Sequence, residues 1–403
     1  MPLLAERTSR AVPSAIMQVA EKAKALKAAG RDIISFSIGV PNFLPGQHVY
    51  DAAIAAVKAD TGQYGSNRGP DALLDSYLLH LTRNGITGYE RKNVVTGMGA
   101  KFVLFNAMYA FLNEGDEVVI PTPYWTSYVD IAHILGAKIS LLTCGLAQDY
   151  KLTPAQLDAA IGPDTKLFIF NNPSNPTGMV YSKAEVLALA EVLKRKPNCW
   201  ILSDDIYNQM VFEGVGWHHL ATLAPELRDR LLILDSVSKT YGMPGWRMGF
   251  MVGPEHVAKA LVALNSNHLT SAPEVVNAAA AAALSGSQDI PAQKCAEFAI
   301  KRDEVLAAFA KVPGMICPRP QGAFYAFPDI SFSFGKYHGQ TLIDSDVAFC
   351  NQLLETKGVA CVPGVAFGEP KSLRISYTCK STELTEGLRR MVEFCHELSA
   401  TAA

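Results

Sequence analysis

The chain has 403 residues, of which 49% are hydrophobic and 18% charged, and its formal net charge is −2. This length exceeds what a single core usually supports, so we expect two globular domains. The near-neutral charge gives no electrostatic basis for binding nucleic acid or an anionic membrane, and no apolar segment is long enough to span a bilayer.

The N-terminal segment indicates an arm followed by part of a domain. Residues 1–13 lack periodicity and have no apolar core of signal-peptide length, which favours a cytoplasmic location. An amphipathic helix is expected from Pro13 to Ala29, closed by Gly30. A strand is expected at 33–38, and a short helix at 50–59.

The middle of the chain alternates short apolar runs with helical patterns. The expected strands are 94–96, 117–120, 138–142, 167–170, 200–203, 231–234 and 250–253. The expected helices among them are 102–112, 127–135 and 183–194. Such alternation predicts an α/β fold with a mostly parallel sheet covered by helices on both faces.

The C-terminal third mixes helices and strands. Helices are expected at 274–284, 293–310, 344–357 and 382–398, and strands at 322–327, 359–362 and 373–377. This pattern predicts a smaller α+β domain, completed by the N-terminal helix and strand. The expected division is an arm at 1–13, small-domain residues at 14–45, a large domain at 46–290 and the rest of the small domain at 291–403.

Several polar or aromatic residues follow the expected parallel strands at their carboxyl ends. They are Lys101, Trp125, Asn175, Asp204, Tyr207 and Lys239. Ligands of such sheets bind beyond the carboxyl ends of the strands. We therefore expect these side chains to meet in one site.

Lys239 lies in a turn between the expected strands 231–234 and 250–253. Burial would lower the pKa of the lysine, which imine chemistry with a carbonyl requires. Ser236, Ser238 and Arg247 supply two hydroxyls and a guanidinium that suit a phosphate. The alternative is an ordinary surface loop with a solvated lysine.

The other residues at the strand ends suit pyridoxal 5′-phosphate. Asp204 is placed to keep the ring nitrogen protonated, Tyr207 and Asn175 to donate to the phenolate oxygen, and Trp125 to stack on the ring. Backbone N–H groups at the helix start formed by Gly99, Ala100 and Lys101 suit the phosphate. Each residue also has a structural alternative: Trp125 as core, Asp204 as a helix cap, Asn175 as a turn residue.

No metal site or disulfide is expected. The eight cysteines include no C-x-x-C pair and most lie in apolar contexts, which favours buried, reduced thiols. The nine histidines show no metal-ligand spacing.

Eight collinear segments carry a resemblance to a known family. They are Gly97–Lys101, Pro121–Trp125, Asn172–Gly178, Ser203–Tyr207, Ser236–Lys239, Gly245–Arg247, Gly322–Tyr325 and Leu373–Ser376. In this order they resemble a fold-type I, pyridoxal 5′-phosphate-dependent aminotransferase of class I/II, closest to the bacterial aspartate aminotransferase subgroup. The resemblance covers nearly the whole chain. It implies a large domain with a seven-stranded-type sheet, and a homodimer with shared active sites.

The resemblance also implies roles for single residues. Lys239 would carry the aldimine of the cofactor and then move the proton at the substrate Cα, while Asp204 would pair with the ring nitrogen. Arg374 would hold the substrate α-carboxylate, and Tyr64 would reach the phosphate of the neighbouring subunit. Gly39, Trp125 and Asn175 would complete the substrate site.

The implied reaction is ping-pong transamination between an amino acid, best aspartate or glutamate, and 2-oxoglutarate or oxaloacetate. Lys101 matches the lysine that contacts a distal carboxylate, although the phosphate is its other candidate partner. Ile16 replaces a frequent threonine, and Val40 and Asn42 replace two carboxylates of the family loop. Alternatives are an aminotransferase for aromatic or neutral amino acids such as alanine, a cysteine-conjugate β-lyase, and a cofactor-binding regulator, for which the N-terminal arm is too short.

Overall fold

A seven-stranded sheet is the largest element of the computed structural model, which describes residues 4–59 and 62–402. Its strand order is β2-β8-β7-β6-β5-β3-β4. The strands are β2 (Val94–Gly97), β3 (Glu117–Thr122), β4 (Lys138–Thr143), β5 (Thr165–Asn171), β6 (Trp200–Asp204), β7 (Leu231–Ser236) and β8 (Gly249–Val252). β8 runs antiparallel to both of its neighbours, β2 and β7, and every other strand pair of this sheet is parallel, so the expected mostly parallel sheet is confirmed.

Successive residues of the central strands enter two different cores. Val118 and Ile120 of β3 point into one hydrophobic cluster, and Val119 points into the other. The period of two in a strand therefore distributes a continuous apolar run over both faces of the sheet. Both faces of the sheet are buried, which explains why these strands appear in the sequence as unbroken apolar segments.

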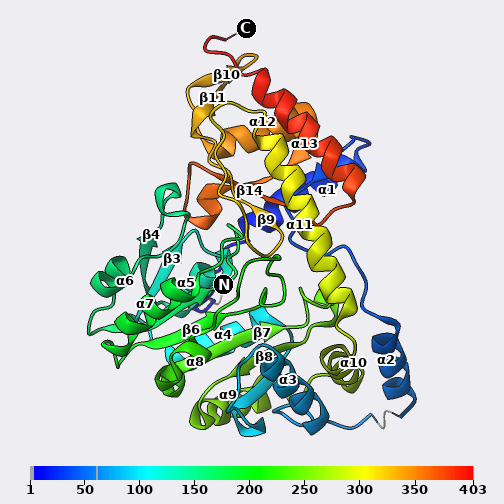
Figure 1. The fold of residues 1–403 in the computed structure, drawn as a ribbon, viewed down its shortest axis with the longest axis vertical. Coiled ribbons are helices and arrows are strands. Elements are labelled where there is room, and N and C mark those ends of the chain that lie inside the picture. The colour runs from blue at the N-terminus through cyan, green and yellow to red at the C-terminus, as the bar shows by residue number, and fades with distance from the viewer. Residues whose placement is uncertain (1–3, 60–61, 403) are drawn as a thin grey trace.

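Helices cover both faces. One face packs against α4 (Ala100–Phe111), α5 (Thr126–Leu135) and α9 (Glu255–His268). The other packs against α2 (Gln47–Ala59), α3 (Asp71–Arg83), α6 (Pro154–Ala160), α7 (Lys183–Lys194), α8 (Leu220–Leu223) and α10 (Glu274–Ser285). In Figure 1 this group forms the lower part of the molecule.

The upper part of Figure 1 is built from both ends of the chain. β1 (Ile34–Ser35) pairs in parallel with β12 (Val359–Ala360), and β14 (Leu373–Ser376) lies between β13 (Val362–Pro363) and β9 (Tyr325–Ala326). β10 (Lys336–His338) and β11 (Thr341–Ile343) form a separate hairpin. The helices here are α1 (Ala15–Ala28), α11 (Asp289–Phe309), α12 (Asp346–Lys357) and α13 (Ser381–His396).

The predicted domain division stays a prediction. The seven-stranded sheet falls within the expected large domain, residues 46–290, and the expected boundary at 290 falls in the first turn of α11. That helix runs upward from beside α10 into the upper part (Figure 1). The first three residues of the expected arm lie outside the described residues.

Four helices of the lower part were not predicted: α3, α6, α8 and α9. α3 follows Pro70, with Asp71 in its first turn, and buries Leu73, Leu74 and Tyr77. This start signal and apolar face were readable in the sequence. α9 begins in the same way after Pro254, with Glu255 in its first turn.

Other differences concern element bounds. The helix expected at 102–112 begins at Ala100, and the strands expected at 33–38 and 322–327 pair over only two residues each. The strand expected at 359–362 is two short strands, separated at Cys361. Among the eight cysteines, five are buried and three are half-buried.

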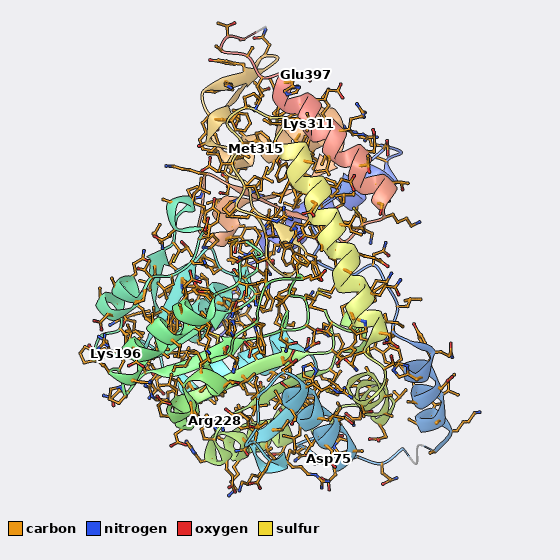
Figure 2. The ribbon with its side chains drawn as sticks, viewed as in Figure 1. Asp75, Lys196, Arg228, Lys311, Met315 and Glu397 are labelled. Carbon is orange, nitrogen blue, oxygen red and sulfur yellow. The ribbon has the colours of Figure 1, made fainter. Side chains whose placement is uncertain are left out.

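Several charged side chains lie at the periphery of both parts. Figure 2 shows Lys196 and Arg228 at the rim of the lower part, and Lys311 and Glu397 at the far end of the upper part. Among the described residues, no helix is long and apolar enough to cross a membrane.

Candidate active site

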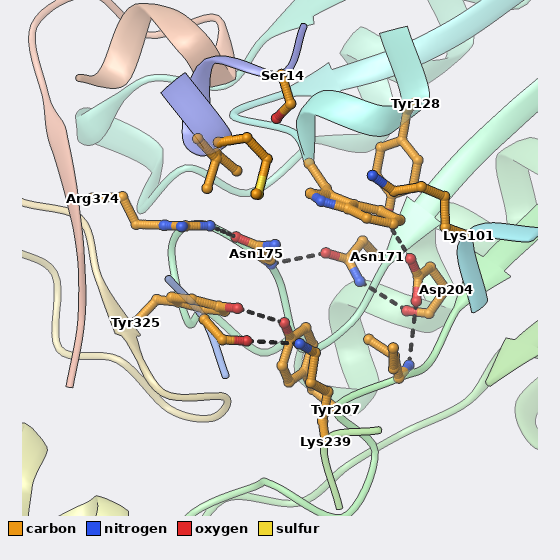
Figure 3. A pocket seen from close by; sticks show the side chains of 15 residues that line it. Ser14, Lys101, Tyr128, Asn171, Asn175, Asp204, Tyr207, Lys239, Tyr325 and Arg374 are labelled. Atoms are coloured by element: carbon orange, nitrogen blue, oxygen red, sulfur yellow. Dashed lines mark hydrogen bonds between the residues drawn. The ribbon is translucent and has the colours of Figure 1, made fainter. Parts of the chain in front are cut away.

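A pocket opens where the two parts meet, beyond the carboxyl ends of the parallel strands (Figure 3). Asn171 ends β5, Asp204 ends β6, and Lys239 follows β7. The residues that line the pocket are Ser14, Ile16, Met17, Gly39, Lys101, Trp125, Tyr128, Asn171, Asn175, Asp204, Ile206, Tyr207, Lys239, Tyr325 and Arg374. All six residues predicted to meet at the strand ends are in this set.

Lys239 is the amine of the pocket. Its Nζ donates a hydrogen bond to the backbone carbonyl of Gly39, at 2.7 Å. Burial lowers the pKa of Lys239 to about 8, with the positive charges of Arg374 and Arg247 acting in the same direction. A lysine with this pKa has a substantial neutral fraction just above neutral pH, and the neutral amine is the form that attacks a carbonyl.

Asp204 is a buried carboxylate of the pocket, at the end of β6. Its Oδ2 accepts a hydrogen bond from Tyr128 Oη at 2.5 Å, and its Oδ1 accepts one from the Ile206 N–H at 3.3 Å. Burial raises the pKa of Asp204 to about 7, although both hydrogen bonds act to lower it. In the described part of the chain no cation pairs with this carboxylate, so it is suited to a cationic group of a ligand.

Tyr207 shares a hydrogen bond with a second tyrosine. Its Oη lies 2.7 Å from Tyr325 Oη, and both side chains are buried. Burial raises the pKa of both phenols above the ordinary value. Both therefore keep their protons at neutral pH and remain hydrogen-bond donors.

Arg374 is a buried guanidinium on β14. Its Nη1 donates to Asn175 Oδ1 at 3.0 Å, and its Nη2 donates to the carbonyl of Ser37 at 2.6 Å. The Nε is buried and has no hydrogen-bond partner among the described residues. Burial lowers the pKa of Arg374, but a guanidinium stays charged. A buried cation without a carboxylate partner favours an anionic ligand.

Lys101 lies in the first turn of α4, with its Nζ 5.4 Å from the centroid of the Trp125 ring. Burial lowers its pKa, and the charge of Arg247 adds to that effect while Asp130 opposes it. Both Lys101 and Trp125 line the pocket. Lys101 thus gives the pocket a cationic group separate from Arg374 and Lys239.

The five residues predicted only for the phosphate of their own chain are absent from the lining of the pocket; they are Gly99, Ala100, Ser236, Ser238 and Arg247. Arg247 Nη2 donates to the Met98 carbonyl at 3.2 Å, next to Gly99, and the Ser238 N–H donates to Ser236 Oγ at 3.1 Å. A Cβ on Gly249, which pairs with Ser236, would lie 2.6 Å from the Ala100 nitrogen. The lysine turn therefore packs tightly against the N-terminus of α4, where Gly99 is the N-cap with φ +88°.

Tyr64 lies away from these residues. Its side chain is 88% exposed, and the adjacent Gly65 N–H donates to Ser271 Oγ at 3.0 Å. Within one chain, the structure does not bring Tyr64 to the pocket.

Sequence reasoning missed several lining residues. Tyr128 is three residues after Trp125, so helical spacing could have identified it, and Asn171 ends a parallel strand as Asp204 does. Tyr325 belongs to a segment that was recognised without a role being given to it. Ser14 and Met17, at the start of α1, carried no signal beyond their position near a helix start.

The residues present fit pyridoxal 5′-phosphate. A lysine with a lowered pKa, an unpaired buried carboxylate and two protonated phenols converge on one pocket. Hydroxyls, an arginine and the N-terminus of α4 lie together beside it. The set matches the aldehyde, the ring nitrogen, the phenolate and the phosphate of this cofactor, and it contains a further arginine for a substrate carboxylate.

Comparisons with known proteins agree with one another. The profile of the family described as "Aminotransferase class I and II" matches residues 31–391. An aspartate/prephenate aminotransferase from Cereibacter sphaeroides is 41% identical over 400 residues, which cover 99% of this chain and all of the relative. An aspartate aminotransferase from Rhizobium meliloti is 39% identical over 98% of this chain and 97% of its own length.

Solved structures agree as well. The crystal structure of an aspartate aminotransferase from Rhizobium meliloti superimposes with a TM-score of 0.96 at 38% identity, over 99% of this chain and all of that one. An aspartate aminotransferase from Thermus thermophilus with maleate gives a TM-score of 0.90 at 29% identity, over 98% of this chain and all of that one.

Proposed function

The chain belongs to the class I and II aminotransferases, which depend on pyridoxal 5′-phosphate, and on this basis we propose that it transfers the amino group of a dicarboxylic amino acid, aspartate or glutamate, to a 2-oxo acid. The observation that carries the proposal is the convergence of Lys239, Asp204 and Arg374 on one pocket. These side chains provide an amine for the cofactor aldehyde, an anion for its ring nitrogen and a cation for the substrate carboxylate.

The cofactor would be held by residues of the lower part. Lys239 would bind the aldehyde carbon, Tyr207 and Asn175 would donate to the phenolate oxygen, and Trp125 would stack on the ring. The phosphate would be bound by the hydroxyls of Ser236 and Ser238, Arg247 and the backbone N–H groups of Gly99, Ala100 and Lys101. When bound, this cofactor acts as a sink for the electron pair that is left at the substrate Cα.

The side chains of this chain perform the remaining tasks. Arg374 and Asn175 bind and orient the α-carboxylate, so that the Cα–H bond faces Lys239. Once the substrate amino group has replaced Lys239 on the aldehyde carbon, the released neutral amine of Lys239 would take the proton from Cα and return it to that carbon. Asp204 is ionised opposite the protonated ring nitrogen and keeps the proton on that nitrogen while negative charge develops from Cα. This is preorganised electrostatic support that stabilises a transition state.

The first experiment tests the use of Lys239. After incubation with pyridoxal 5′-phosphate, borohydride should leave the cofactor attached covalently to Lys239, as read by peptide mass mapping. Lys239→Ala should show no adduct and no turnover, whereas Lys101→Ala serves as a control that retains the label. An adduct on another lysine in the wild-type protein would refute the proposed site.

The choice of substrate rests on Lys101. Its ammonium lies in the first turn of a helix, where it opposes the helix dipole, so an anionic partner is favoured. The proposed partner is the distal carboxylate of aspartate or glutamate. Ile16, an apolar residue of the same pocket, offers no hydrogen bond to that group.

Lys101→Ala tests this choice. The substitution should lower kcat/KM for aspartate and glutamate about tenfold or more, in line with the loss of one partly buried charge contact. It should change kcat/KM for alanine or phenylalanine far less. A panel of standard amino acids with 2-oxoglutarate, oxaloacetate and pyruvate gives the comparison. An equal fall for all donors would assign Lys101 to the phosphate or to the fold instead.

We add a fourth acceptor, prephenate, to that panel. The relative from Cereibacter sphaeroides is named as acting on prephenate as well as aspartate. Prephenate combines a 2-oxo acid with a ring carboxylate, and the pocket combines Lys101 with the apolar Ile16 and Met17. We therefore include prephenate among the proposed acceptors. Turnover of prephenate with aspartate, and its loss in Lys101→Ala, would support this extension.

We also propose a homodimer with shared active sites. The support is Tyr64, a large and highly exposed aromatic residue on a segment anchored by Ser271, outside the pocket of its own chain. In the dimer its hydroxyl would bind the phosphate held by the other subunit.

A further inference from the structure

Tyr325 touches three parts of the site that have separate tasks. Its hydroxyl lies 2.7 Å from Tyr207 Oη, and its ring centroid lies 4.7 Å from Cζ of Arg374. A Cβ on Gly39 would lie 2.0 Å from its hydroxyl oxygen, so the tyrosine also packs directly on the segment whose carbonyl binds Lys239. Figure 3 shows this side chain between Arg374 and Tyr207.

The strands fix the first of these contacts. β9 pairs with β14 so that Tyr325 is opposite Ser376, and Arg374 is two residues before Ser376 on the same face of its strand. Arg374 and Tyr325 are therefore diagonal neighbours in the sheet, a spacing that aromatic and long side chains can bridge. The backbone register thus delivers the ring to the guanidinium.

The guanidinium has a second aromatic neighbour. The ring centroid of Phe367 lies 4.8 Å from Cζ of Arg374. An arginine that lies over aromatic rings still presents its N–H groups at the edge of the guanidinium for hydrogen bonds. Two edge nitrogens are held by Asn175 and Ser37, so the orientation of the remaining edge is determined before any carboxylate binds.

The hydroxyl of Tyr325 acts on Tyr207 rather than on Arg374. When Tyr207 donates its proton to a ligand oxygen, its own oxygen can still accept a hydrogen bond, and Tyr325 is the donor at that position. A hydroxyl that accepts a hydrogen bond becomes a stronger donor itself. Since burial keeps both phenols protonated at neutral pH, this order of donation is available throughout the working range.

We propose that Tyr325 is a positioning residue with two separable functions: its ring orients Arg374 for the substrate carboxylate, and its hydroxyl strengthens the hydrogen bond from Tyr207 to the cofactor phenolate. This inference rests on the proposed transamination. The inference goes beyond that proposal because it gives one side chain an effect on both the carboxylate site and the electronic state of the cofactor.

Two substitutions separate the functions. Tyr325→Phe removes the hydroxyl and keeps the ring, whereas Phe367→Leu removes the second aromatic neighbour of Arg374 and leaves every hydroxyl in place. Tyr325→Leu removes both features of Tyr325. The measurements use the enzyme loaded with pyridoxal 5′-phosphate: the midpoint of the pH titration of the cofactor absorption, and the Kd of the non-reacting dicarboxylate maleate at one pH below all midpoints.

Tyr325→Phe should raise the titration midpoint by about 0.3–0.7 pH unit, because a weaker donor stabilises the anionic phenolate less, and should change the Kd of maleate less than about twofold. Phe367→Leu should raise that Kd about tenfold and leave the midpoint in place. Tyr325→Leu should show both effects; if it does not fold, the first two variants still decide.

The proposal is overturned if Tyr325→Phe leaves the midpoint unchanged, if Phe367→Leu leaves the Kd unchanged, or if both variants change both quantities alike, as a purely structural role would. Failure of the proposed function looks different. In that case the wild-type protein itself shows no cofactor absorption and no adduct on Lys239.

Discussion

Asp204 shows, at the scale of one residue, that the site is built for a ligand rather than for the stability of the free protein. The carboxylate is 2% exposed, and its neutral hydrogen-bond donors only partly offset the loss of water. A cationic ring nitrogen next to Asp204 would offset the free energy lost when the carboxylate is buried. The free protein should therefore be less stable than it would be with a neutral side chain at this position.

The pH dependence of this effect has a definite sign. The pKa of Asp204 in the folded protein is about 7, above the ordinary 3.8 of an unfolded chain. Between these values the unfolded chain releases the proton and the folded protein retains it, so stability falls as the pH rises. The destabilisation is absent near pH 3.8, grows with pH, and reaches its full value above pH 7.

Asp204→Asn should therefore stabilise the cofactor-free protein at pH 8, by about 2 to 3 kcal/mol, and hardly at all near pH 4. The amide retains only one of the two acceptors, which reduces the gain. The same variant should lose most of its transamination activity, because an amide cannot hold the ring proton. Melting temperatures at the two pH values provide the measurement.

Asp205→Asn is the matched control. Asp205 is equally buried, but His219 Nε2 lies 2.7 Å from its Oδ2. Its replacement should lower the melting temperature. A melting temperature of Asp204→Asn at pH 8 equal to or below that of the wild-type protein would contradict the argument.

At the scale of elements, the lysine turn is held by a buried polar cluster that sequence reasoning did not identify. Asp235, at the end of β7, accepts a hydrogen bond from the Ser236 N–H at 2.7 Å. Its Oδ2 accepts from Asn208 Nδ2 at 2.8 Å and lies 3.1 Å from His80 Nε2 of α3. Tyr241, two residues after Lys239, contacts His80 Nδ1 at 3.2 Å. The turn is thus tied to α3 on both sides of the lysine.

Asp235→Ala should lower the free energy of unfolding by about 3 kcal/mol, because it leaves the buried partners of the carboxylate unsatisfied. Asp71→Ala is the comparison: Asp71 pairs with Arg91, but both side chains are exposed, so its loss should change stability by less than about 1 kcal/mol. Thermal unfolding of both variants tests the contrast. Equal melting temperatures would show that the cluster contributes no more than a surface ion pair.

The same elements show which features of the structure can be predicted from the sequence. The parallel strands and the residues at their carboxyl ends were predictable, because apolar runs and the strand-end rule depend only on local pattern. The contact of His80 with Asp235 was not, since 155 residues separate the partners and neither residue type marks the other. Tyr325 was missed for a related reason: its role depends on the pairing of β9 with β14, and a register is not visible in a two-residue strand.

For the whole molecule, the proposed dimer makes each site depend on two chains. Lys239 and Arg374 lie in the pocket, whereas Tyr64 of the same chain is exposed elsewhere. If Tyr64 serves the neighbouring site, two inactive variants can complement each other. A hybrid of a Lys239→Ala chain with a Tyr64→Ala chain contains one site with both substitutions and one site with neither.

Mixing the two variants under conditions that allow subunit exchange should therefore restore activity, with each hybrid dimer reaching about half the wild-type value. Each variant alone should be inactive or, for Tyr64→Ala, should bind the cofactor weakly. Tagged chains allow the hybrid to be isolated and assayed. A hybrid no more active than the mean of its parents would show that Tyr64 does not act across the interface.

The pairing of β1 with β12 has a consequence for how the chain is made. Ile34 pairs with Val359 in the sheet, and Val359 is translated more than 300 residues after Ile34. The N-terminal strand therefore cannot pair until that later segment has been synthesised. At ordinary rates of ribosomal synthesis this delay is on the order of 15 to 65 seconds. During that time Ile33, Ile34 and Phe36, all buried in the finished protein, have no partner strand. β1 is thus among the last strands to reach its final place, and the nascent chain carries an unpaired apolar segment until its own C-terminal part emerges.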